Sequence, residues 1–163
     1  MVNSISSQPG ANRFRSLLVM ILVLICIVIF LGYSQYLTQQ TDRVARDRVI
    51  SEVRQALAMM LYDYAVKGKL QQLQRFDREN PFTLMAAYRP VPKAYRGTLV
   101  DEPAKLSAGW YYDLSRRQVI WQARDGERQR FVLRLDYQDG NHNGRFDAGR
   151  EELIGLDIKK ASE

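Results

Sequence analysis

The stretch that decides how this chain is organised is LLVMILVLICIVIFL, residues Leu17 to Leu31. It is apolar throughout, and no charged residue occurs from Ser16 through Thr41. As an α-helix, residues 16–36 would extend about 31 Å, which matches the hydrocarbon core of a bilayer. Because backbone polar groups in hydrocarbon must be satisfied within the segment, we expect a single transmembrane helix.

The charges beside this apolar run predict its orientation. Arg13 and Arg15 precede it, whereas Asp42 is the first acidic residue in the sequence. The positive-inside rule then makes residues 1–15 a cytoplasmic tail and sends the remainder across the membrane. A cleaved signal peptide is the alternative, although no Ala-x-Ala site follows the run. We expect a single-pass protein of a bacterial inner membrane with a periplasmic C-terminal domain.

Cysteine and charge content restrict the classes of function. The only cysteine is Cys26, which excludes an intrachain disulfide framework and a cysteine-ligated zinc site. An exported domain without disulfides is more typical of a bacterium than of a secreted eukaryotic module. The formal net charge of +6 is spread along the sequence. Nucleic-acid binding needs a clustered basic patch, and no run of sufficient density occurs, so the sequence argues against a nucleic-acid partner.

The segment after the membrane run has the pattern of an amphipathic helix. No glycine or proline occurs from Tyr33 to Lys67. Apolar residues recur there at spacings of three and four, as in a helix that covers a core with one face: Ile50, Val53, Leu57, Met60 or Leu61, and Tyr64. We expect one helix from about Ser16 to Ala65. Residues 37–77 form the amphipathic helical region, which includes the end of this helix and the segment after it. Gly68 would end or interrupt it, and Leu70–Phe76 would add a turn or two.

The rest of the chain predicts a loop followed by a sheet. Residues 78–108 contain four of the five prolines, so no long helix can form there. Within residues 109–163, turn signals separate four apolar or alternating stretches that are typical of short antiparallel strands: 110–112, 119–121, 131–137 and 153–158. The predicted fold class is therefore α+β, a long N-terminal helix packed on a four-stranded antiparallel sheet. We interpret the strand aromatics as core residues.

One loop carries the pattern of a metal site. Residues 139–147 read DGNHNGRFD, which fits the start of a calcium loop of the type D-x-[DN]-x-[DN]-G. The predicted ligands are side-chain oxygens and one backbone carbonyl: Asp139, Asn141, Asn143, Arg145 through its carbonyl, and Asp147. Arg150 stands where a bidentate acid is expected, and Asp-Gly and Asn-Gly pairs are ordinary turn formers. A weak Ca²⁺ site and a plain turn both remain open interpretations.

Catalysis finds no support in the sequence. The only histidine, His142, lies in that same loop and is expected to point to solvent. Neither a Ser/His/Asp constellation nor a phosphate-binding glycine loop can be assembled. We therefore expect a protein that binds other proteins, not an enzyme, and no small-molecule substrate.

Three short motifs carry a resemblance to a known family. The order of parts resembles the pilin and pseudopilin architecture. Gly109-Trp110-Tyr111-Tyr112-Asp113 with Val119-Ile120-Trp121 resembles the Trp-Tyr-Tyr-Asp hairpin of pseudopilin-like assembly proteins. Together with Asn80-Pro81-Phe82, it is similar to the MshF family of MSHA-type pilus biogenesis proteins. The resemblance implies a pilin-like fold and an accessory role in type IV pilus biogenesis, with other pilus assembly proteins and the inner membrane as partners.

The N-terminus departs from the pilin pattern. Gly10 precedes Ala11, and no acid occurs before Asp42, where pilins have a glutamate near the start of the mature helix. An uncleaved accessory protein therefore fits better than a major filament subunit. Two alternatives stay open: a DNA-binding minor pilin-like protein that would contact phosphates, and a structural subunit of another envelope complex.

Overall fold

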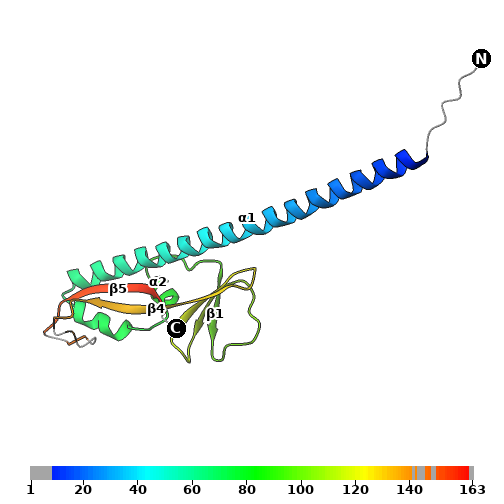
Figure 1. Cartoon of the computed structure of the whole chain (residues 1–163). Coiled ribbons are helices and arrows are strands. Elements are labelled where there is room, and N and C mark those ends of the chain that lie inside the picture. The colour runs from blue at the N-terminus through cyan, green and yellow to red at the C-terminus, as the bar shows by residue number, and fades with distance from the viewer. Residues whose placement is uncertain (1–8, 141, 143–145, 148–149, 162–163) are drawn as a thin grey trace, which may run out of the picture. The chain divides into compact units, whose positions relative to one another are not determined.

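The computed structural model describes residues 9–140, 142, 146–147 and 150–161, with side chains from residue 14 onward. Its fold class is α+β (Figure 1). The described elements are α1 (Pro9–Val66), the 3₁₀ helix η1 (Leu70–Phe76), α2 (Pro81–Met85), β1 (Tyr95–Leu99), β2 (Gly109–Asp113), β3 (Gln118–Gln122), β4 (Arg128–Tyr137) and β5 (Leu153–Lys160). The chain forms two compact units, residues 1–40 and 41–163, which we describe separately.

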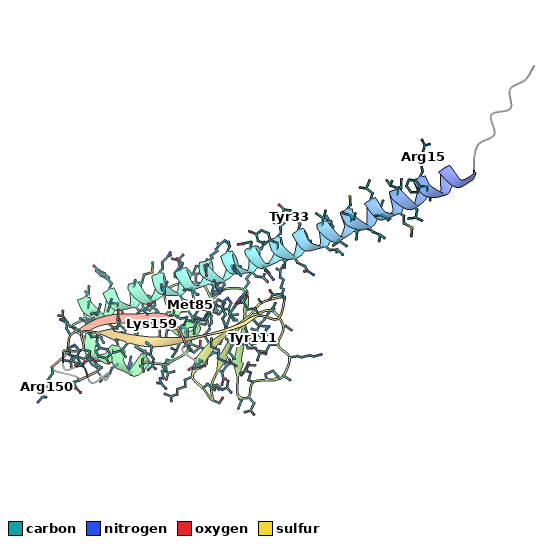
Figure 2. All side chains as sticks on the ribbon, in the orientation of Figure 1. Arg15, Tyr33, Met85, Tyr111, Arg150 and Lys159 are labelled. Carbon is teal, nitrogen blue, oxygen red and sulfur yellow. The ribbon has the colours of Figure 1, made fainter. Side chains whose placement is uncertain are left out.

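The first unit is the N-terminal part of α1. Its apolar side chains are exposed, as seen between Arg15 and Tyr33 in Figure 2; Phe30, for example, is 70% exposed. Burying one such side chain is worth about 1.5–3 kcal/mol, so a run of them in water would be unfavourable. Among the described residues, α1 is the one helix that is long and apolar enough to span a membrane. The unit is thus consistent with a single-pass membrane protein.

The two ends of α1 have clear local causes. The helix begins at Pro9, earlier than the expected Ser16, and proline is well suited to the first helical position. It ends at Val66, close to the expected Ala65. Gly68 adopts a positive φ of 64°, and the backbone N–H of Lys69 donates to the carbonyl of Tyr64 at 2.8 Å. A glycine in this conformation is the common C-terminal cap of a helix.

In the second unit, α1 packs its apolar stripe on the sheet. The predicted stripe residues Val53, Leu57 and Met60 are 0–3% exposed. Val49 and Ala56 are also buried and widen the stripe. Polar contacts reinforce this packing between distant segments: Asp42 accepts from the backbone N–H of Arg124, Arg46 donates to Gln129, and Arg54 pairs with Asp157.

The sheet has five strands in the order β1-β2-β3-β4-β5. Strands β2 to β5 are antiparallel neighbours, whereas β1 pairs in parallel with β2. The prediction of four antiparallel strands is therefore wrong: the sheet is mixed and has one strand more. The extra strand comes from residues 78–108, where we expected a loop. Its five residues contain no proline and lie at a sheet edge, where a short strand is tolerated between prolines.

Residues of the proline-rich segment fill the core. Asn80 caps α2 by accepting a hydrogen bond from the backbone N–H of Phe82 at 3.0 Å, and Pro81 occupies the first turn. The Phe82 ring stacks on Tyr95 at 4.4 Å and meets the edge of Trp110 at 5.9 Å. The short helix and β1 are therefore part of the folded unit.

Trp110 is at the centre of the aromatic core. It is fully buried, and its ring lies 5.0 Å from Trp121 and 5.6 Å from Phe131. Tilted and edge-on aromatic pairs of this kind add to the stabilisation that comes from buried area. The interpretation of the strand aromatics as core residues is confirmed for Trp110, Tyr112 and Trp121, whereas Tyr111 is buried outside this cluster.

Candidate functional site

The two faces of the sheet differ in chemistry. Along β4, Phe131 and Leu133 belong to the core that α1 covers. Successive strand residues point to opposite faces, so Arg128, Arg130 and Arg134 project on the other side. This second face therefore carries a row of arginines.

Three adjoining hollows lie on this second face, with volumes of about 670, 770 and 280 Å³. The smallest is central, because it shares lining residues with each of the other two. Seven basic side chains line the three hollows, and we call them the basic face: Arg78, Arg116, Arg128, Arg130, Arg134, Lys159 and Lys160.

At one end of the basic face, a single carboxylate holds three arginines. The Glu102 side chain is only 13% exposed and lies in the connection between β1 and β2. It accepts hydrogen bonds from Arg128, from Arg130 at 3.0 and 3.1 Å, and from Arg116 at 3.3 Å. The Nε of Arg130 is shielded from solvent without a hydrogen-bond partner among the described atoms. Positive charge therefore exceeds negative charge at this end.

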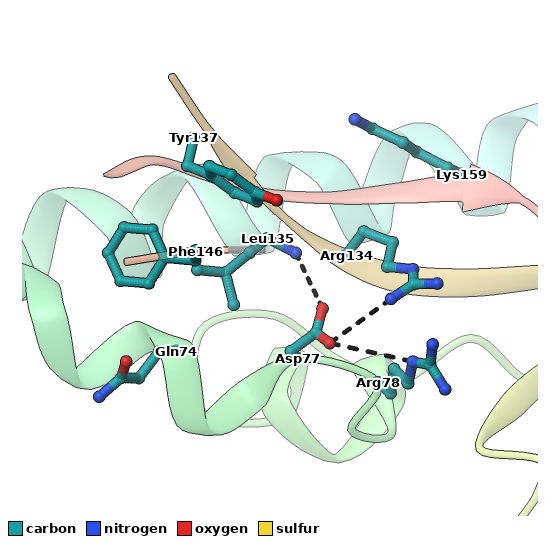
Figure 3. A pocket seen from close by; sticks show the side chains of 8 residues that line it. All are labelled: Gln74, Asp77, Arg78, Arg134, Leu135, Tyr137, Phe146 and Lys159. Carbon is teal, nitrogen blue, oxygen red and sulfur yellow. Dashed lines mark hydrogen bonds and ion pairs between the residues drawn. The ribbon is translucent and has the colours of Figure 1, made fainter. Parts of the chain in front are cut away.

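At the other end of the basic face, the carboxylate of Asp77 lies between Arg78 and Arg134, as that of Glu102 lies among arginines at the first end (Figure 3). Its carboxylate accepts a hydrogen bond from the backbone N–H of Leu135 at 3.0 Å and lies 3.7 Å from Arg134 and 3.9 Å from Arg78. The backbone N–H of Arg78 donates to the carbonyl of Leu133 at 2.9 Å, which places this segment beside β4. Backbone contacts thus fix the position of Asp77.

The central hollow is lined by five basic side chains and, among the described residues, by no acid. Its lining residues are Arg78, Arg116, Gln118, Val132, Arg134, Lys159, Lys160 and Ala161. Arg116 pairs with Glu102 at one end of this hollow, and Arg78 and Arg134 pair with Asp77 at the other. The ammonium group of Lys159 lies 3.4 Å from the carboxylate of Asp136. Guanidinium and ammonium groups gathered in this way favour an anionic ligand.

Sequence reasoning missed the basic face because its members are far apart in the chain. Arg78 lies between η1 and α2, Arg116 between β2 and β3, and Lys159 in β5 opposite Val132, so only the tertiary fold brings them together. The one local signal was the repetition of arginine at positions 128, 130 and 134, every second or fourth residue of a strand. A charge that is spread along the sequence is therefore concentrated in space.

The predicted calcium loop lies only partly within the described residues. Asn141, Asn143 and Arg145 fall outside them, and Asp139 and Asp147 fall within. The Phe146 ring lies 5.5 Å from Tyr137. His142 is exposed.

Carboxylates gather at the base of this loop. Glu151 accepts a hydrogen bond from the backbone N–H of Asp147 at 2.9 Å, and its other oxygen is shielded with no partner among the described atoms. Burial raises the pKa of the Tyr137 phenol, and the carboxylates of Asp139 and Glu151 raise it further. The part of the loop that the structure describes contains no group of three metal-binding side chains, so calcium binding stays a prediction.

Comparison with protein-family models, curated proteins and solved structures finds no match to this chain. Its architecture and its surface chemistry are therefore the basis for a functional interpretation.

Proposed function

We propose that this chain is a membrane-anchored accessory component of a type IV, MSHA-like pilus biogenesis machinery and that it acts by binding other proteins. The observation that carries the proposal is that α1 contains both the exposed apolar run and the stripe that packs on the sheet. This order of parts, with the Trp-Tyr-Tyr-Asp hairpin around Trp110, underlies the resemblance to the MshF family. A pilin-like fold belongs to the same proposal.

The proposed orientation places the N-terminus in the cytoplasm and the sheet in the periplasm of a bacterium. It is supported by Arg13 and Arg15 before the apolar run and by the absence of acids in the sequence before Asp42. A reporter that is active only in the periplasm should work when fused after Glu163. Activity of a cytoplasmic reporter at that position would refute the orientation.

The pilus role is tested by deleting the gene in the bacterium that encodes it and counting surface pili. We expect piliation to fall and to return when the full-length chain is expressed. In the same strain, a photo-crosslinker placed in the sheet unit should capture pilus assembly proteins, and an unrelated single-pass protein serves as the control. Normal piliation in the deletion strain would refute the role and leave another envelope complex as the alternative.

A weak calcium site in residues 139–147 is a separate proposal. The hydrogen bond from the backbone N–H of Asp147 to Glu151, whose other oxygen is shielded without a partner among the described atoms, supports it. With few charged ligands, the dissociation constant should lie in the range of about 10⁻⁴ to 10⁻³ M. At 100 times that concentration, calcium should stabilise the chain by about 2.7 kcal/mol, and D139A/D147A should remove the shift in melting temperature. If calcium at that concentration leaves the wild-type melting curve unchanged, the loop is only a turn.

A further inference from the structure

The central hollow of the basic face points to a ligand of definite chemistry. We infer that it binds an acidic side chain from an extended, Asp- or Glu-rich segment of a partner protein. The inference rests on the proposed function only in that the partner is a protein. It assigns the docking site and the chemistry that the partner must present.

The first argument is that this surface already binds carboxylates at both ends. Glu102 is held by three arginines, and Asp77 lies within 4 Å of two. The guanidinium fork matches the two oxygens of a carboxylate in geometry and charge. Between these two carboxylates, five cations line a hollow of about 280 Å³ that has no acid among the described residues. Among the described residues, Asp136 contacts one of these cations, Lys159, but no carboxylate lines the middle of the row as one does at each end.

The second argument is the spacing of the cations. Arg128, Arg130, Val132 and Arg134 follow each other at every second position of β4 on one face. This repeat is about 6.8 Å in an antiparallel strand. Lys159 is paired in register with Val132 and supplies a cation at the position where the row has an apolar residue. An extended peptide that carries acids at alternate positions has the same repeat, so several of its carboxylates can meet cations at once.

The third argument separates a peptide from a nucleic acid. Proteins that bind single strands combine a basic groove with aromatic side chains on which the bases stack. No described aromatic residue lines the central hollow or the adjoining 770 Å³ hollow. Tyr111 lies on this face but is buried, and its hydroxyl donates to the carbonyl of Ser107. Tyr137 and Phe146 line the 670 Å³ hollow at the Asp77 end, where their rings pack edge to face on each other at 5.5 Å. The central hollow therefore offers charge without a stacking platform.

The experiment measures binding of short fluorescent probes to the full-length chain in nanodiscs of zwitterionic lipid. The probes are an octapeptide that alternates Glu and Thr, the same peptide with Gln in place of Glu, and an eight-residue oligothymidylate. The wild-type chain should bind the Glu peptide at least tenfold more tightly than the other two. Its affinity should fall as salt rises, because exposed charges are screened.

Two sets of variants locate the site. K159Q/K160Q removes two cations from the central hollow and should weaken binding of the Glu peptide by roughly tenfold. K69Q/K93Q removes the same charge from exposed lysines that line none of the three hollows and should leave the affinity within about twofold. E102Q frees the arginines at one end of the row and should strengthen binding severalfold, a gain that misfolding cannot produce.

Each contrary result overturns the inference in a distinct way. Absence of Glu-peptide binding, or equal affinity for the Glu and Gln peptides, refutes recognition of carboxylates. Tighter binding of oligothymidylate identifies a nucleic-acid surface instead. Equal losses in the two double variants refute the assigned position. Because these measurements use the purified chain, a normal piliation phenotype with intact peptide binding would refute the pilus role and leave the docking site standing.

Discussion

The two faces of the sheet are built from the same strands, yet one packs against α1 and the other carries exposed basic side chains. On the covered face, Trp110, Leu133 and Ile158 are at most 2% exposed and pack against α1. On the other face, Arg134 and Lys159 are 42% and 49% exposed and surround a basic hollow. One face supplies the stability of the unit and the other supplies its surface chemistry. Substitutions on the two faces should therefore have different consequences.

The largest difference is expected between two neighbours on β2. Trp110→Ala removes the centre of the aromatic core and should lower the free energy of unfolding by about 3–5 kcal/mol. Tyr111→Phe, on the opposite face, loses only the hydrogen bond to Ser107 and should cost about 0.5–1.5 kcal/mol. Urea unfolding of the full-length chain, followed by tryptophan or far-UV signals, measures both. Equal effects would contradict the central place of Trp110 in the aromatic core.

A second comparison contrasts the two sides of α1. Leu57 is 2% exposed and lies in the core, so Leu57→Ala should destabilise the sheet unit by about 2–5 kcal/mol. Met59 is 48% exposed on the same helix, and Met59→Ala should change the free energy of unfolding by less than about 0.5 kcal/mol. Similar melting temperatures for the two variants would show that the stripe is not core.

The edge between β1 and β2 provides a third test. Gly109 has a φ of 148°, and an added Cβ would lie 2.8 Å from the carbonyl oxygen of Ala94. Gly109→Ala should therefore cost about 1–3 kcal/mol through strain and loosen β1. Gly140→Ala, where a Cβ meets open space, is the matched control and should be close to neutral. Thermal unfolding distinguishes them, and a neutral Gly109→Ala would argue against the close approach of β1.

The smallest expected effect is on the pH dependence of stability, through the buried phenol of Tyr112. Burial is the main cause that raises the pKa of the Tyr112 phenol above its usual 10.0, and its hydroxyl donates to the carbonyl of Arg78 at 2.7 Å. The folded chain keeps this proton at pH values where the unfolded chain has lost it. The contribution of this proton to the free energy of unfolding is therefore fully present below pH 10 and is lost as pH rises through the raised pKa of Tyr112.

Tyr112→Phe removes this titration, so the decline in stability above pH 10 should become shallower than in the wild type. Unfolding curves in urea at several alkaline pH values measure the slope. Tyr88, whose pKa is also raised by burial, should leave part of the decline in place. An unchanged slope in Tyr112→Phe would mean that this phenol titrates alike in the folded and unfolded chain.

Local patterns in the sequence determined the helix and most of the sheet. The charge-free run from Ser16 to Thr41 and the period of Val53, Leu57 and Met60 were sufficient to predict a long helix with a buried stripe. Gly68 was expected to end or interrupt it, and the structure supplies the physical reason, a left-handed cap at φ 64°. Turn signals between apolar or alternating stretches predicted strands β2 to β5, and the alternation is clearest in β4, as expected for a strand with one covered face.

Only the tertiary structure decided the remainder. A five-residue strand among prolines has no periodicity of its own, so β1 became visible only through its pairing with β2. The basic face brings together Arg78 from the η1–α2 connection, Arg116 from the β2–β3 turn and Lys159 from β5, and residues so distant in sequence share no local signal. Periodicity records which side of an element meets the core, since burial acts on each residue separately. The meeting of distant charges depends on which strands become neighbours, and that is a property of the whole fold.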